Sequence, residues 1–177
     1  MNTPIHTERA VFGIDLGSTC GIARGDQYDG AVVGGVTARS IVLCPEKRLR
    51  ASSKAQLRGQ DPRVVEFART LDIELGSVPS TSTALVVFED VQFAKSLAQA
   101  QLWASFRGAL WAHYAHYSSI AAVPTGALKM FATGRGDATK DEMAHAAVAR
   151  WGARNVAGWD DNAVDAAWLV AYGLDKL

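Results

Sequence analysis

Short apolar runs separated by polar turns fill much of the chain and predict the strands of a sheet. Two of these runs flank the tight turn at residues 17–19, which favours antiparallel pairing between them. A later run of β-branched and aromatic residues is typical of a strand buried on both faces. The predicted strands are residues 11–14, 20–23, 40–44, 84–88 and 120–123.

Helical periodicity predicts helices at residues 63–75, 96–117, 128–131, 139–151 and 161–174. In the longest of these, large apolar side chains cover roughly 200° of the circumference, about twice what a helix with one buried face needs. Gly108 lies in its middle, where glycine costs about 1 kcal/mol relative to alanine and indicates close approach of another helix. We expect one face of this helix to pack on the sheet and the other to contact a partner.

The order of the elements predicts an α/β fold with a mixed central sheet flanked by helices, in which three antiparallel strands precede parallel ones. The 177 residues are 49% hydrophobic and fit one domain over residues 1–177, with residues 1–9 as a flexible start. No apolar run reaches about 18 residues and the start lacks the order of a secretion signal. We therefore expect a cytoplasmic protein.

Charge is balanced, because Lys plus Arg and Asp plus Glu each number 18. A global positive field, the simplest sign of a nucleic-acid binder, is absent, so any phosphate binding must come from local patches. One such patch is the stretch 46–63, where six basic residues outnumber two acidic ones. We expect a mobile basic loop here, with Arg48, Arg50 and Lys54 among its phosphate-binding residues.

Three acidic residues each end or interrupt an apolar element. Asp15 and Glu89 follow predicted strands, and Asp165 lies inside the apolar last helix. A carboxylate in such a place is costly to desolvate unless a cation pairs with it, and no Arg or Lys adjoins these acids in the sequence. Mg²⁺, which prefers oxygen ligands, is the natural counter-charge. Two such ions about 3.5–4 Å apart would serve phosphoryl transfer.

Each acid also has a structural interpretation. Asp15 could cap a turn, Glu89 could be a charged strand end, and one of the two acids before the last helix is expected to be its N-cap. Asp165 lies one turn further in, where capping does not explain it. Both Asp161 and Asn162 have the spacing that places them on the helix face of Asp165.

Four sequence blocks, in order from residue 11 to 173, carry a family resemblance. They are Gly13-Ile-Asp15-Leu-Gly-Ser-Thr-Cys-Gly-Ile22, Glu89-Asp-Val-Gln-Phe93, Lys129-Met-Phe-Ala-Thr-Gly-Arg-Gly-Asp-Ala-Thr-Lys140 and Asp161-Asn-Ala-Val-Asp165-Ala. Together they resemble the RuvC family of Holliday-junction resolvases in its compact, phage-like form. The resemblance implies an RNase H-like fold, a homodimer, and an endonuclease of DNA recombination and repair in bacterial or phage-infected cells.

The resemblance also implies a metal site with two Mg²⁺ or Mn²⁺ ions. Asp15, Glu89 and Asp165 match metal ligands of the family. For the fourth ligand we prefer Asp161, since a carboxylate neutralises a metal and an amide does not, with Asn162 as the alternative.

Further residues match the family's DNA contacts. Lys129 and Lys140 match basic positions, and Lys140 could act in catalysis by offsetting charge on the phosphate, although an isolated lysine is also ordinary surface. Arg135 is expected to hold DNA through phosphates. Phe93 resembles an aromatic that wedges into the junction, but it falls one residue later and could belong to the core.

Other functions stay open. One is a non-catalytic junction-binding protein whose metal site is lost, which Asn162 permits. Another is an ATP-binding domain, because residues 14–19 resemble the phosphate loop of the actin and hexokinase ATPases. Those proteins need two such domains, for which 177 residues leave no room. The nuclease could also act on flaps or forks instead of junctions.

Overall fold

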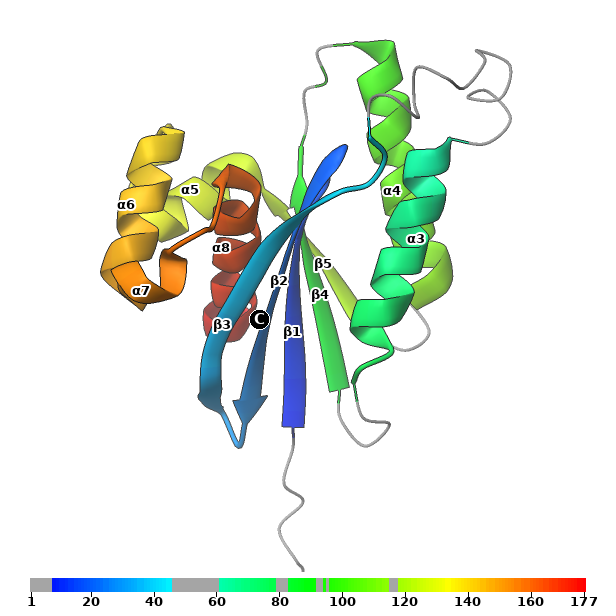
Figure 1. Cartoon of the computed structure of the whole chain (residues 1–177). Coiled ribbons are helices and arrows are strands. Elements are labelled where there is room, and N and C mark those ends of the chain that lie inside the picture. Colours follow the sequence, from blue (N-terminus) through cyan, green and yellow to red (C-terminus); the bar gives the residue numbers. More distant parts are fainter. Residues whose placement is uncertain (1–7, 46–60, 79–82, 92–93, 95, 115–117) are drawn as a thin grey trace, which may run out of the picture.

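The computed structural model describes residues 8–45, 61–78, 83–91, 94, 96–114 and 118–177. Five strands form one sheet in the order β3-β2-β1-β4-β5 (Figure 1). The first three pair antiparallel, whereas β4 and β5 run parallel to β1, which confirms the predicted mixed sheet. Their bounds are Glu8–Asp15 (β1), Thr19–Tyr28 (β2), Ala31–Val42 (β3), Thr83–Asp90 (β4) and Ser118–Pro124 (β5).

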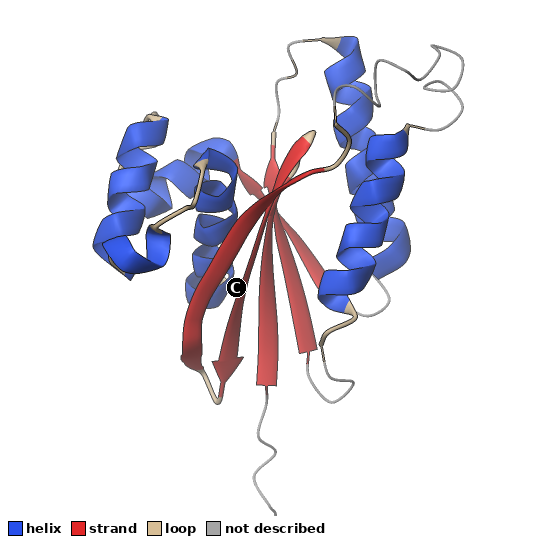
Figure 2. Ribbon diagram, in the orientation of Figure 1, coloured by secondary structure: helices blue, strands red, loops and turns tan. Residues whose placement is uncertain are grey.

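Helices form a layer on each side of the sheet (Figure 2). One layer contains α3 (Pro62–Leu75) and α4 (Leu97–Tyr114). The other contains α5 (Thr125–Thr133), α6 (Lys140–Trp151), α7 (Ala153–Val156) and α8 (Asp161–Lys176). Of these helices, only the short α7 lies outside the predicted ones. Within the described ranges, no helix combines the length and the apolar character needed to span a bilayer.

The sheet separates two hydrophobic cores, because successive side chains of a strand point to opposite faces. Val11 of β1 and Val87 of β4 pack with the buried residues of α8 in one core. Phe12 and Phe88, on the alternate positions, pack in the other core with side chains of α3 and α4. The same alternation fixes the direction of any side chain at the ends of these strands.

The hairpin of β2 and β3 is longer than the sequence analysis predicted. Residues 24–28 and 31–39 extend the two strands, and the turn between them is Asp29-Gly30, with φ of 48° and 82°. A two-residue turn with both φ positive matches the twist of a hairpin. Glu8 and Arg9, which the sequence analysis assigned to a flexible start, belong to β1 and pair with β2. The rest of that predicted start, residues 1–7, lies outside the described residues.

Candidate active site

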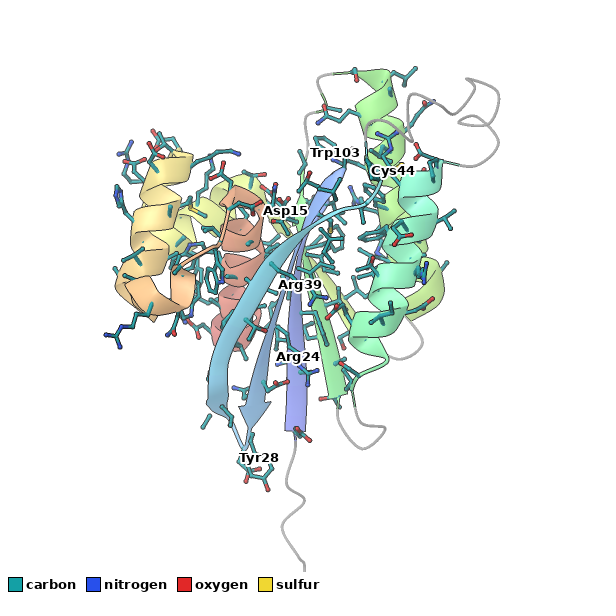
Figure 3. All side chains as sticks on the ribbon, viewed as in Figure 1. Asp15, Arg24, Tyr28, Arg39, Cys44 and Trp103 are labelled. Carbon is teal, nitrogen blue, oxygen red and sulfur yellow. The ribbon has the colours of Figure 1, made fainter. Side chains whose placement is uncertain are left out.

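Asp15 and Glu89 end neighbouring parallel strands and face the same side of the sheet. The β1–β4 register pairs Ile14 with Phe88, so the two acids are the next residue on each strand. By alternation they continue the rows that contain Val11 and Val87, whose side chains pack with α8. Figure 3 shows Asp15 at the end of β1, next to the layer that contains α8.

Two glycines let α8 lie directly on β1 and β2. A Cβ on Gly13 would lie 2.0 Å from the backbone oxygen of Ala166, and a Cβ on Gly21 would lie 2.0 Å from that of Asn162. Any side chain at these positions would therefore push the helix away from the sheet. The absence of side chains brings the helical turn that carries Asp165 close to the end of β1.

The acids from these three elements act on one another electrostatically. Burial, followed by the charges of Asp165 and Glu89, raises the pKa of Asp15 to about 8. Burial and then the charge of Glu89 raise the pKa of Asp165 to about 7. The structure thus places Asp15, Glu89 and Asp165 in one half-buried carboxylate cluster, although they lie far apart in the sequence.

Two lysines from the α5–α6 segment lie near the carboxylate cluster. Lys140, the first residue of α6, donates a hydrogen bond from Nζ to Oδ2 of Asp161 over 2.8 Å. Its charge lowers the pKa values of Asp15 and Asp165 against the effect of burial. Lys129 of α5 also acts to lower the pKa of Asp165. Both lysines are therefore placed to meet an anion bound beside the carboxylates.

The two acids before Asn162 have different partners. Asp160 is the N-cap of α8 and accepts hydrogen bonds from the backbone N–H of Ala163, at 3.0 Å, and from Ser40. Burial raises the pKa of Asp160, but these hydrogen bonds and those from Asn162 lower it further, so the pKa stays below its usual value. The Asn162 side chain is thus engaged with Asp160, whereas Asp161 is exposed and paired with Lys140.

The chemistry of the donors in this site fits a hard divalent cation. Carboxylate oxygens from Asp15, Glu89 and Asp165, with Asp161 beside them, are ligands that Mg²⁺ and Mn²⁺ accept. Within the described part of the chain, however, no three His, Cys, Asp or Glu side chains converge closely enough to hold an ion. The elements bring the acids together while the side chains stand apart, as mutual repulsion favours.

The remaining predicted DNA contacts have different outcomes. Arg135 lies in the exposed loop after α5, where it pairs with Asp137 and, over 2.8 Å, with Glu142. Glu142 in turn forms a capping box with Thr139 at the start of α6. Arg135 therefore helps to order the loop before Lys140. The predicted contacts Arg48, Arg50, Lys54 and Phe93 lie outside the described residues.

An ion pair behind the carboxylate cluster was not predicted from the sequence. Asp90 follows Glu89 and, by strand alternation, turns to the opposite face, where it pairs with Arg107 of α4 at 2.9 Å. The Arg107 guanidinium also stacks on Phe88 and Trp111. The alternation of β4 was the signal that could have separated the roles of Glu89 and Asp90.

The face of α4 that points away from the sheet is largely apolar and exposed. Leu97 is 75% exposed and Trp111 50%, and a Cβ on Gly108 would meet nothing within 4 Å. A groove of about 260 Å³ runs beside this face. An exposed apolar face is thus present on the helix, and the close neighbour expected at Gly108 does not come from the described part of the chain.

Comparisons of sequence find no matching family model and no significant match among curated proteins. Comparisons of structure do find similar folds. The structure of Thermus thermophilus RuvC in complex with a Holliday junction substrate has a TM-score of 0.65 and 21% identity, covering 91% of this chain and 90% of that one. Another Thermus thermophilus RuvC structure has a TM-score of 0.62 and 21% identity, covering 93% of both chains.

A third similar structure is the yeast mitochondrial Holliday junction resolvase Ydc2. Its TM-score is 0.62 at 14% identity, and the match covers 97% of this chain and 80% of that one. The three matches cover from 91% to 97% of this chain. They show that this chain has the RuvC-type, RNase H-like fold that the sequence resemblance implied.

Proposed function

We propose that this protein is a metal-dependent endonuclease that resolves Holliday junctions or other branched DNA by hydrolysing phosphodiester bonds. The observation that carries the proposal is the carboxylate cluster of Asp15, Glu89 and Asp165 at the end of a RuvC-type sheet. The similar structures support the substrate class, because one of them is a complex with a Holliday junction substrate.

In this proposal, Asp15, Glu89, Asp161 and Asp165 hold two Mg²⁺ or Mn²⁺ ions. Such a pair, when bound, activates a water molecule and neutralises the leaving oxygen of a phosphodiester. The half-buried setting of Asp15 and Asp165 strengthens their attraction for cations, since charges interact more strongly away from bulk water. Binding also releases protons near neutral pH, because a carboxyl must be ionised to serve as a ligand.

The basic residues of the proposed site bind the DNA. Lys140 donates to an oxygen of the scissile phosphate and offsets the negative charge that grows there in the transition state. Lys129, one helix away, holds a neighbouring phosphate. Arg135 and the basic residues Arg48, Arg50 and Lys54 hold the DNA arms through their phosphates, so binding should weaken strongly with salt and depend little on base sequence.

We further propose a homodimer, because a four-way junction is two-fold symmetric and symmetric cuts need two active sites related by a two-fold axis. The exposed apolar face of α4, with Leu97 and Trp111, is the surface that supports this proposal. It lies on the side of the sheet opposite to α8, so pairing there leaves the carboxylate cluster open to DNA.

A cleavage assay on defined DNA structures tests the proposed activity. The purified protein is incubated with a synthetic four-way junction, a fork and a linear duplex, with and without Mg²⁺, and the nicks are mapped. We expect paired, symmetric nicks on the junction only when Mg²⁺ is present. Binding without nicks in any condition would instead favour the non-catalytic junction-binding alternative.

The variant Asp15→Asn tests the metal-ligand assignment in the same assay. It should still bind the junction. Its cleavage rate should fall by more than roughly 10–100-fold, which is the loss seen when a residue that only supports a metal ligand is removed. Asp175→Asn is the matched control, because Asp175 belongs to the same helix as Asp165 but pairs with Arg150 at its far end. Retained Mg²⁺-dependent cleavage by Asp15→Asn would refute the assignment.

A further inference from the structure

Lys140 is bound to one of the four acids proposed as metal ligands. Its Nζ lies 2.8 Å from Oδ2 of Asp161, and the two side chains are 72% and 52% exposed. An ion pair this exposed contributes little to stability, so a stronger ligand can displace either partner at small cost. The contact is therefore weak enough for a metal ion to break it.

The position of Lys140 puts its charge within reach of the whole cluster. Its hydrogen bond to Asp161 and the charges of Asp161, Asp165 and Asp15 raise the pKa of the Lys140 ammonium. Among the described residues, no other basic side chain forms an ion pair with any of the four acids. Lys129 influences Asp165 only from a distance. Lys140 thus supplies the nearest positive charge to a group of carboxylates that repel one another.

The backbone of Lys140 is fixed although its side chain is free to turn. Thr139 caps α6 and exchanges hydrogen bonds with Glu142 in a capping box, and Arg135 ties the preceding loop to Glu142. Lys140 therefore begins its helix at a defined place, from which a long, flexible side chain can reach either Asp161 or an anion beside it.

We propose that Lys140 is the resident counter-cation of the metal-free site, and that a divalent ion must take Asp161 from it, which releases Lys140 to bind the DNA phosphate. This inference rests on the proposed function and assigns Lys140 two successive partners. It also accounts for the orientation of Asp161, whose Oδ2 faces Lys140 of α6. Binding of the metal ion and release of Lys140 toward the phosphate then occur in the same step.

Mn²⁺ binding to the DNA-free protein tests this exchange without any cleavage. We expect Lys140→Gln to bind Mn²⁺ about two- to fivefold more tightly than the wild type by calorimetry, the factor that loss of an exposed ion pair corresponds to. Lys129→Gln is the matched control, because it removes a nearby positive charge without breaking the ion pair. It should tighten Mn²⁺ binding less.

A double-mutant cycle separates the ion pair from the general effect of charge. In the Asp161→Asn background, Lys140→Gln should change Mn²⁺ affinity no more than Lys129→Gln does, because there is no longer a carboxylate to release. If Lys140→Gln has the same effect in both backgrounds, or none in the wild type, the exchange is wrong and the nuclease proposal stands. A wild type that binds no Mn²⁺ overturns both.

Discussion

At the scale of single residues, Asp15 and Asp165 are acids that the fold holds in a setting unfavourable to their charge. Their pKa values of about 8 and 7 compare with the usual 3.8, so the folded chain binds their protons more tightly than the unfolded chain. Stability therefore falls with rising pH wherever only the folded state stays protonated. For the metal-free protein this window runs from about pH 4 to about pH 8.

The variant Asp15→Asn should remove much of this pH dependence. Its amide carries no charge, so at pH 8 in EDTA the variant should melt above the wild type, by about 2–4 °C for each kcal/mol gained. Near pH 5 the difference should shrink, because Asp15 of the folded wild type is then protonated. Thermal unfolding followed by circular dichroism measures the melting temperatures at both pH values, with Asp175→Asn as the control. Melting below the wild type at pH 8 would contradict this account of Asp15.

The acids also show how far the sequence could predict the site. Asp15 and Glu89 were predictable because each ends an apolar strand, and Asp165 because it interrupts an apolar helix. The contact between Lys140 and Asp161 was not, because it depends on how α6 packs beside α8. The sequence also left both Asp161 and Asn162 open as the fourth ligand, since both have the right spacing. It did not predict their different partners, which are Lys140 for Asp161 and Asp160 for Asn162.

At the scale of elements, the close packing of α8 on the β1–β2 hairpin positions the site. A Cβ on Gly21 would lie 2.0 Å from the Asn162 oxygen and 3.2 Å from the Cβ of Ala166. Gly21→Ala should therefore push α8 outward and lower the free energy of unfolding by about 1–3 kcal/mol, as overpacking does. Because the same shift moves Asp165 from Asp15, Mn²⁺ affinity should fall as well. Urea unfolding and calorimetry measure the two effects.

Gly108→Ala is the control for this prediction, since it makes the same chemical change where a Cβ meets no neighbour within 4 Å. Inside a helix such as α4 it should raise the free energy of unfolding by about 0.5–1 kcal/mol. Equal losses in Gly21→Ala and Gly108→Ala would mean that contact with α8 is not what Gly21 provides.

The elements were predictable where one physical signal dominated. Helical periodicity predicted α3, and an apolar run predicted β4, both nearly to their ends. The hairpin of β2 and β3 was only partly found, because residues 31–35 are exposed and include two glycines with positive φ. Such a segment lacks the apolar alternation of a half-buried strand. The turn Asp29-Gly30 was the missed signal.

At the scale of the whole molecule, the proposed active site and the proposed dimer surface lie on opposite sides of the sheet. The carboxylate cluster faces α8, and α4 lies on the other side of the sheet (Figure 1). The exposed apolar residues Leu97 and Trp111 belong to α4. The tip of the β2–β3 hairpin, marked by Tyr28, lies at the end of the sheet away from Asp15 (Figure 3). The proposed DNA binding at the carboxylates and the proposed second subunit on α4 are therefore compatible with each other.

Gly108→Trp should convert a dimer into a monomer, because a bulky ring on the exposed side of α4 would keep two such helices apart. Size-exclusion chromatography with light scattering measures the mass. Ala149→Trp, on the exposed side of α6, is the matched control and should stay dimeric. A dimeric Gly108→Trp would exclude this part of α4 as the interface, and a monomeric wild type would refute the homodimer.

One peptide bond joins Glu89, on the side of α8, to Asp90, which is held by Arg107 on the side of α4. Insertion or deletion of a single residue within β4 would reverse the sheet faces toward which Glu89 and Asp90 point. The side chain of Glu89 would then point toward α4 instead of α8. Insertion or deletion of two residues would leave both side chains on their present faces. Natural variation in the length of this strand should therefore occur in even steps, whereas the loops around it can vary freely.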